Sequence, residues 1–226
     1  MKKSLFIFIL VGLLCLSACG TPKDNTPTKP VDTSAADTKP TATQPESTPT
    51  EPTVFEPQPG YFPIPEEPAT FTFLSGAGGW WTEMDINTDG TFSGRYQDGE
   101  MGASGEGYQA TYYVCDFSGV FADVEKVDQN TYKVRLASIS TIEPIGKEWI
   151  DKEIRYIAAA PHGLYDYDKK QNCEEFIVYM PTTPVSELSE EFLSWWPYRG
   201  ENKDTLECFG LMNVTTQHGF FYTPEA

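Results

Sequence analysis

Four aromatic side chains in the middle of this 226-residue chain could bind a ligand by stacking: Trp80, Trp81, Tyr96 and Tyr108. Aromatic rings stack on sugar rings or on apolar molecules, and the Trp N–H and Tyr O–H add a polar contact. Successive strand residues point to opposite faces. Trp81 alternates with Glu83, so we expect Trp81 to face solvent. Core packing is the competing role for the other three.

Hydrolysis is a second chemistry to consider, because a glycosidase needs two carboxyl groups roughly 5–10 Å apart. The chain has two histidines, His162 and His218, and it lacks the Gly-x-Ser-x-Gly motif of serine hydrolases. A carboxylate-dependent hydrolase is therefore an alternative to a binding module. The simpler interpretation of the many carboxylates is that they are solvated surface charges. The acidic candidates are Glu83, Asp85, Asp98, Glu106 and Asp116.

Three cysteines, Cys115, Cys173 and Cys208, lie in the second half of the chain. Cys173 and Cys208 each stand beside a predicted strand, and an exported domain permits a disulfide between them. Buried free thiols are an equally good expectation, because a free cysteine packs as a small apolar group. The cysteines and histidines lack zinc-ligand spacing such as C-x-x-C, so we expect neither a metal nor a cofactor.

The stretch from Asp85 to Gly90 copies the first half of a calcium-binding loop, D-x-N-x-D-G. Such a loop needs a carboxylate at its twelfth position, and that position is Tyr96 here. The flanking residues alternate with the period of strands. Asp89-Gly90 between two such runs instead predicts a tight hairpin turn.

The N-terminus has the layout of a secretory signal: two lysines, an uncharged run from Ser4 to Leu16, and small residues. The run is too short to span a bilayer, which takes roughly 20 apolar residues. Its ending, Leu-Ser-Ala-Cys, resembles the lipobox of bacterial lipoproteins. In that family the signal is cut before the cysteine, which then carries lipid. The resemblance implies removal of residues 1–18, a lipid on Cys19, and a place on the extracytoplasmic face of the cell membrane.

Composition divides the rest of the chain at Ala69. Residues 19–68 hold 12 of the 18 prolines and few apolar residues, which predicts a disordered linker. Contact of this linker with the domain is expected to start near Tyr61, Phe62 and Ile64. Residues 69–226 form one predicted domain with 11 Lys and Arg against 25 Asp and Glu. The net charge of −17 argues against nucleic acid as a partner, since such binding depends on basic residues.

The predicted domain is dominated by strand patterns. Short runs of alternating apolar and polar residues separated by turns predict an all-β, mainly antiparallel barrel or sandwich. One helix is expected between Thr183 and Pro197, with Pro184 at its first position and apolar residues at helical spacing. The glycine-rich stretch from Asp98 to Gly107 is expected as a hairpin loop, placed as a lip at the mouth of a barrel.

Two stretches carry a family resemblance. Gly79-Trp80-Trp81 contains the Gly-x-Trp of the first barrel strand of lipocalins, although alternation puts Trp80, not Trp81, on the face shared with Met84. GGWWTEMDINTDGTFSGRY and the later TPVSELSEEFLSWW resemble a group of lipoproteins and secreted proteins of Gram-positive bacteria. This second resemblance implies export and anchoring and carries over no catalytic residue.

These observations together predict a lipid-anchored extracytoplasmic binding module for a small molecule, a glycan or a protein. An aromatic-lined cavity is expected at one barrel end, between Trp80, Tyr96 and the glycine-rich loop. The alternatives are a carboxylate-dependent hydrolase acting on the cell wall and a structural protein of the envelope.

Overall fold

The computed structural model describes residues 55–100, 102–197 and 203–222. The predicted signal, Cys19 and most of the predicted linker lie outside these residues. The barrel strands are β1 (Ala69–Leu74), β2 (Trp80–Ile86), β3 (Thr91–Glu100), β4 (Ala110–Lys126), β5 (Thr131–Thr141), β10 (Glu175–Tyr179), β11 (Gly210–Asn213) and β12 (Gly219–Tyr222). The other strands are β6 (Glu148–Asp151), β7 (Ile154–Ala158), β8 (Tyr165–Asp166) and β9 (Gln171–Asn172).

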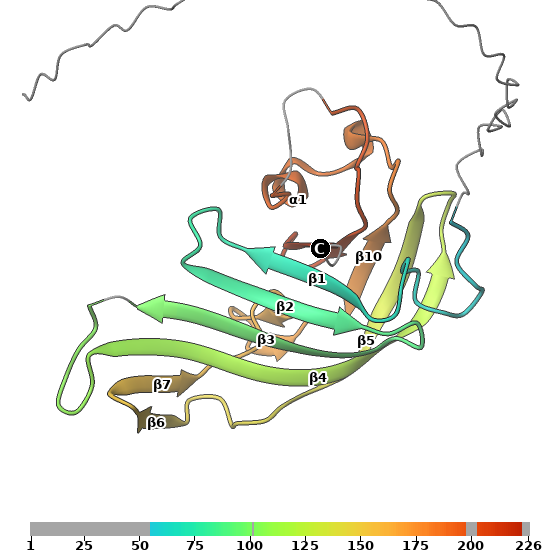
Figure 1. The fold of residues 1–226 in the computed structure, drawn as a ribbon. Coiled ribbons are helices and arrows are strands. Elements are labelled where there is room, and N and C mark those ends of the chain that lie inside the picture. Colours follow the sequence, from blue (N-terminus) through green and yellow to red (C-terminus); the bar gives the residue numbers. More distant parts are fainter. Residues whose placement is uncertain (1–54, 101, 198–202, 223–226) are drawn as a thin grey trace, which may run out of the picture. The chain divides into compact units, whose positions relative to one another are not determined.

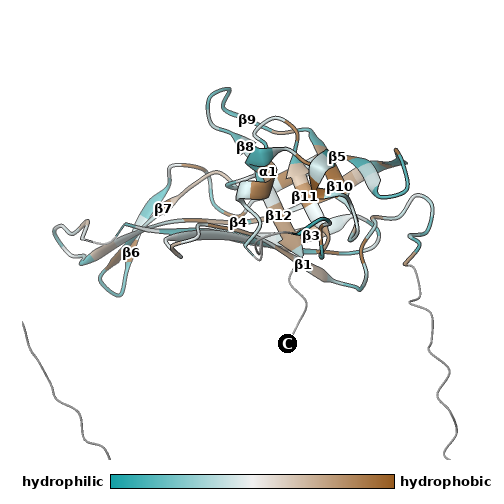
Figure 2. Cartoon of the chain, turned by 90° about the horizontal axis from the view of Figure 1, so that it is seen from above, coloured by the Kyte–Doolittle hydropathy of each residue, from teal (hydrophilic) through white to brown (hydrophobic). Residues whose placement is uncertain are grey.

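Eight antiparallel strands close into a barrel. They follow one another around it in chain order, β1-β2-β3-β4-β5-β10-β11-β12, and β12 pairs back with β1. The long connection from β5 to β10 carries the four other strands (Figures 1 and 2). Closure pairs every barrel strand on both sides, so that the barrel itself has no edge strand. The all-β prediction is confirmed, in its barrel form.

The hairpin between β2 and β3 is formed by the predicted turn. Gly90 has a φ of +83°, which glycine adopts readily. The Asp89 carboxylate accepts hydrogen bonds from the backbone N–H and the hydroxyl of Thr91, and these bonds lower the pKa of Asp89. Tyr96, at the position that a calcium loop would use for a carboxylate, is buried in the barrel core.

Large apolar side chains fill the barrel interior. The alternation predicted for β2 is confirmed, because Thr82, Met84 and Ile86 are fully buried while the residues between them face outward. The same pattern runs around the barrel and joins its inward residues in one cluster. Its members include Phe71, Phe73, Phe92, Phe117, Phe121, Phe176, Val178, Leu211 and Phe220.

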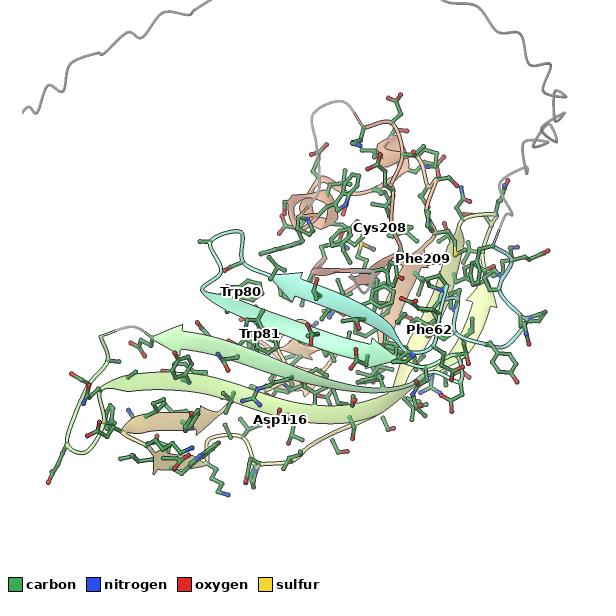
Figure 3. The ribbon with its side chains drawn as sticks, viewed as in Figure 1. Phe62, Trp80, Trp81, Asp116, Cys208 and Phe209 are labelled. Atoms are coloured by element: carbon green, nitrogen blue, oxygen red, sulfur yellow. The ribbon has the colours of Figure 1, made fainter. Side chains whose placement is uncertain are left out.

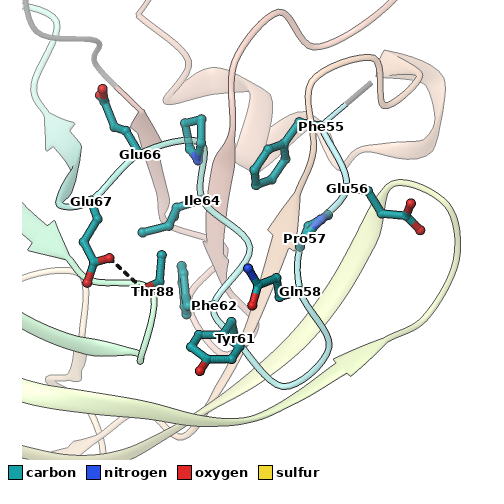
Figure 4. Close-up of a pocket in the computed structure, with 11 residues that line it drawn as sticks. Phe55, Glu56, Pro57, Gln58, Tyr61, Phe62, Ile64, Glu66, Glu67 and Thr88 are labelled. Carbon is teal, nitrogen blue, oxygen red and sulfur yellow. Dashed lines mark hydrogen bonds between the residues drawn. The ribbon is translucent and has the colours of Figure 1, made fainter. Parts of the chain in front are cut away.

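The segment before β1 closes one end of the barrel. Phe62 is 2% exposed, its ring lies 5.4 Å from that of Phe121, and its backbone N–H donates to the carbonyl of Thr88 (Figure 4). Ile64 is buried in the same cluster, whereas Tyr61 is 47% exposed. The contact predicted near Phe62 and Ile64 is confirmed, and the folded unit begins before Ala69 because these apolar side chains complete the core.

The loop 159–164, between β7 and β8, closes the other end. Leu164 is fully buried, and the His162 ring stacks on Phe73 with centroids 5.3 Å apart. A Cβ on Gly163 would lie 2.5 Å from the ring of Phe220, so only glycine fits this close approach. Both ends of the barrel are thus closed by its own chain, whereas the sequence predicts an aromatic-lined cavity at one of them.

The predicted helix is shorter and starts later. A 3-10 turn at Val185–Glu187 precedes α1 (Glu190–Ser194), and the hydroxyl of Ser189 caps α1 by accepting from the Phe192 N–H. Thr183 does not cap a helix, because its hydroxyl donates to the carbonyl of Met180. The apolar residues of this region pack against the outward side chains of β11 and β12 in a second cluster, beside α1 in Figure 2.

β3 and β4 extend beyond the barrel and carry two further strands. Ala110–Val114 of β4 pairs in parallel with β7, and β7 pairs with β6. We name this extension the side sheet: the outer ends of β3 and β4 together with β7 and β6. The glycine-rich stretch between β3 and β4 lies at the tip of this extension and is not the expected lip of a barrel mouth.

Candidate functional site

A hollow of about 250 Å³ lies where β4 changes its neighbour. β4 pairs with β7 as far as Val114 and with β5 from Phe117 onward. Between these points the Ile142 N–H donates to the carbonyl of Asp116, and the Ala159 N–H donates to that of Val114. The chain segments that contain Ile142 and Ala159 diverge here and leave a space that we name the sheet hollow. Its lining includes Arg95, Asp116, Glu143, Trp149, Asp151 and Tyr156.

The sheet hollow opens on the outer face of the sheet. On β4, Cys115 and Phe117 belong to the barrel core, so the alternating Tyr112, Val114 and Asp116 face outward. Burial raises the pKa of the Cys115 thiol to about 12, so this cysteine stays protonated and unreactive.

Three aromatic rings form a row beside the hollow. In the strand register Tyr112 is opposite Tyr156, and Tyr156 is opposite Trp149, so the three share one face. The Trp149 and Tyr156 rings stack with centroids 5.3 Å apart and planes 16° apart. Tyr156 and Tyr112 follow at 6.2 Å and 28°. Trp149 and Tyr156 are both partly exposed and both line the hollow.

Charged groups surround these rings. Arg95 Nη1 lies 3.6 Å from Asp116 Oδ1, and both side chains are nearly half exposed. The ammonium of Lys147 pairs with Glu143 and lies 5.8 Å from the Trp149 ring centroid, as in a cation–π contact. Exposed pairs of this kind contribute about 1 kcal/mol or less to folding. Their donors and acceptors are therefore available for a ligand at little cost to stability.

The outer face continues from the hollow toward Trp81. Gln97 of β3 is opposite both Val114 of β4 and Trp81 of β2. Figure 3 labels Trp81 on β2 and Asp116 on β4. Trp81 is partly exposed and alternates with the buried Thr82, as the sequence predicts. Trp81 thus shares a face with the sheet hollow.

The other three predicted ligand residues lie elsewhere. Trp80 packs on Phe73 with ring centroids 4.7 Å apart, and Tyr96 is buried in the core, so the competing core role is the observed one. Tyr108 lies beneath the guanidinium of Arg155, 5.6 Å from its ring centroid. None of these three lines the sheet hollow.

Trp149 and Tyr156 are the site residues that the sequence analysis missed. β6 has only four residues, too few to show a clear alternation. Tyr156 comes next to Tyr112 only through the parallel pairing of β7 with β4, which joins residues 44 positions apart. The one available signal is the exposed pattern Lys-Glu-Trp-Ile-Asp, in which a tryptophan stands among charges.

Of the five acidic candidates, Asp116 alone lines the sheet hollow. Glu83 is opposite Arg95 on the side away from Asp116, so Arg95 stands between these two residues in the strand register. Asp85 instead accepts a hydrogen bond from Thr70. The hollow brings two carboxylates that the sequence did not single out, Glu143 and Asp151, close to Asp116.

The expected disulfide is absent, since Cys115, Cys173 and Cys208 are all free. Cys173 belongs to the barrel core, whereas Cys208 packs against the second apolar cluster outside the barrel. The barrel wall separates the two environments. This corrects the pairing of Cys173 with Cys208 in favour of the free-thiol alternative.

A second hollow of about 360 Å³ is formed by the segment that closes the barrel (Figure 4). Its polar lining is largely engaged within the protein: Glu67 accepts from the Thr88 hydroxyl, and Glu66 accepts from the Tyr222 hydroxyl. The sheet hollow, with stacked rings and charged groups of both signs, is the stronger candidate for a ligand.

Two further observations bear on the kind of site. Among the described residues, no group of three or more His, Cys, Asp or Glu side chains is arranged to hold a metal ion. In the same part of the chain, no helix is long and apolar enough to cross a membrane.

Comparisons of the chain with protein-family models, with curated proteins and with solved structures find no match. The Gly-x-Trp of the sequence stands at the start of β2, the second barrel strand, and the barrel by itself does not tie the chain to the lipocalins.

Proposed function

We propose that this protein is a lipoprotein, held on the extracytoplasmic face of the cell membrane by lipid on Cys19, whose barrel domain binds a neutral glycan at the sheet hollow. The observation that carries the binding proposal is the row of Trp149, Tyr156 and Tyr112 beside a polar hollow. Sugar rings offer C–H faces to aromatic rings and hydroxyls to carboxylates and guanidinium groups. A few polar groups within an aromatic surface are the usual composition of a small-ligand site.

The charge of the domain favours a neutral glycan over an anionic one. Residues 69–226 hold 25 acidic against 11 basic residues, and three carboxylates line the hollow with one arginine. A polyanionic sugar chain would be repelled at close range, because this field acts over the Debye length of about 8–10 Å.

Hydrolysis is the second candidate, since three carboxylates share the hollow. A glycosidase acid keeps its proton near neutral pH because it is buried. Asp116 and Glu143 are instead 45% and 38% exposed and pair with Arg95 and Lys147. The hollow therefore supports binding better than cleavage.

Changing Trp149 to Ala is expected to weaken glycan binding at least tenfold, about 1.4 kcal/mol, because the largest ring of the hollow is lost. The measurement is calorimetric titration of the full chain with chitotetraose and cellotetraose, two neutral β-1,4-linked tetrasaccharides. Tyr61→Ala removes an exposed aromatic ring outside the hollow and serves as the matched control.

Three outcomes would count against this function. Equal affinities of Trp149→Ala and the unchanged chain would remove the hollow as the site. Stronger binding of an oligogalacturonate tetramer than of the neutral tetramers would reverse the charge argument. Release of new reducing ends from either neutral tetramer would favour the hydrolase.

Changing Cys19 to Ala is expected to abolish lipid labelling of the protein, because this side chain is the proposed attachment point of the acyl chains. Growth of bacteria producing either chain with a palmitate analogue measures this directly. The unchanged chain should carry the label, and equal labelling of the Cys19→Ala chain would overturn the anchor.

A further inference from the structure

We infer that the site takes an extended oligosaccharide of at least three units, which runs across the strands from the sheet hollow to Trp81. This inference rests on the proposed function and deepens it. Its starting point is that Trp81 lies on the same outer face as the hollow, although Trp81 does not line it. A single sugar bound in the hollow would leave Trp81 without a role in binding.

The strand register gives the path between the two ends. Val114 lines the floor of the hollow, Gln97 is opposite Val114, and Trp81 is opposite Gln97. Neighbouring strands lie 4.7–4.9 Å apart, so Trp81 stands roughly 10 Å from Val114 along this row. That span is about the length of a disaccharide. A first unit in the hollow, one over Gln97 and one on Trp81 make three.

Polar side chains follow the same path. Two positions along each strand from the row of Val114, Gln97 and Trp81 lies a second row on the same face. It consists of Asp116 on β4, Arg95 on β3 and Glu83 on β2, which stand opposite one another. The amide of Gln97 and the guanidinium of Arg95 offer donors, while the carboxylates of Asp116 and Glu83 offer acceptors. A sugar chain on this face therefore meets hydrogen-bonding partners at each strand.

Gly99 keeps the aromatic row close to the sheet. Gly99 lies on β3, opposite Tyr112 of β4, and a Cβ on Gly99 would lie 3.1 Å from the Tyr112 ring. The Tyr112 ring thus lies over β3 in the space left by the missing side chain. A larger side chain at position 99 would have to displace the Tyr112 ring from this place.

The test compares ligand lengths in calorimetric titrations of the full chain. Chitotetraose is expected to bind at least tenfold more tightly than chitobiose. Trp81→Ala should weaken binding of the tetramer at least fivefold and change binding of the dimer less than twofold. Trp149→Ala should weaken binding of both. Ser93→Ala, an exposed change on the same face of β3 but off the path, should alter neither.

The outcomes separate this inference from the function beneath it. Equal affinities for dimer and tetramer, with no effect of Trp81→Ala, would overturn the extended site and leave a one-sugar or two-sugar site in the hollow. Binding of neither ligand, nor of the corresponding cello-oligosaccharides, would overturn both the extended site and the proposed function.

Discussion

A chain carrying Phe62→Ala is expected to unfold with a free energy about 3–5 kcal/mol below that of the unchanged chain. Phe62 is 2% exposed and packs on Phe121 at the end of the barrel. Its removal deletes the transfer free energy of a whole aromatic ring and leaves a cavity that rigid strands cannot fill. Urea unfolding followed by tryptophan fluorescence measures the difference.

The neighbouring Tyr61 supplies the control for this prediction. Because Tyr61 is 47% exposed, Tyr61→Ala should change the free energy of unfolding by about 0.5 kcal/mol or less. If the two variants were equally stable, residues 55–66 would not belong to the folded core, and the domain would begin at Ala69 as the composition predicts.

The second large effect is a loss of stability in mild acid that depends on His162. Burial, with the nearby His218, lowers the pKa of His162 from 6.5 to about 4. The unfolded chain therefore binds more protons than the folded one between these two pH values. The contribution of the neutral His162 to the free energy of unfolding is fully present above about pH 6.5. It is lost as the pH drops toward 4, by at most about 1.4 kcal/mol per pH unit for one group.

The surroundings of His162 explain why its charged form is disfavoured. Its ring meets those of Phe73, Trp80, Tyr96, Tyr167 and His218. Burial raises the pKa of Tyr96 well above its usual value and that of Tyr167 to about 12, so neither tyrosine supplies a negative charge. Burial also lowers the pKa of His218, with Glu191 acting in the opposite direction.

The variant His162→Phe isolates this group, because phenylalanine keeps an aromatic ring against Phe73 and removes the titration. Free energies of unfolding at pH 7, 6 and 5 should fall less steeply for the variant than for the unchanged chain. The difference between the two chains is the informative quantity, because it cancels the titration of all groups that both chains share. If the free energies of unfolding of the two chains fell in parallel with pH, burial would impose no free-energy cost on protonation of His162 in the folded state.

Local patterns in the sequence were sufficient for the local features of the fold. Alternation along β2 placed Trp80 inward and Trp81 outward, and Asp89-Gly90 marked the hairpin turn, because both signals depend only on adjacent residues. The all-β class, as a barrel or a sandwich, followed from many such strands. The helix was overextended because apolar spacing alone does not reveal that Thr183 bonds to Met180 instead of capping.

The candidate site could not be predicted because it depends on distant pairings. Trp149 and Tyr156 belong to the connection between β5 and β10, and only the pairing of β7 with β4 brings them beside Tyr112. Closure of the barrel by Phe62 and Leu164 is equally non-local. Of the four aromatic side chains that the sequence names as ligand residues, one, Trp81, lies on the face of the candidate site.

The five tryptophans of the chain provide the most direct test of glycan binding at the sheet hollow. Each indole N–H gives one signal in a nitrogen–hydrogen correlation spectrum of the full chain. On titration with chitotetraose, the signals of Trp149 and Trp81 should shift together with the bound fraction, while those of Trp80, Trp195 and Trp196 stay in place. Saturable binding that leaves Trp149 unchanged would contradict the account.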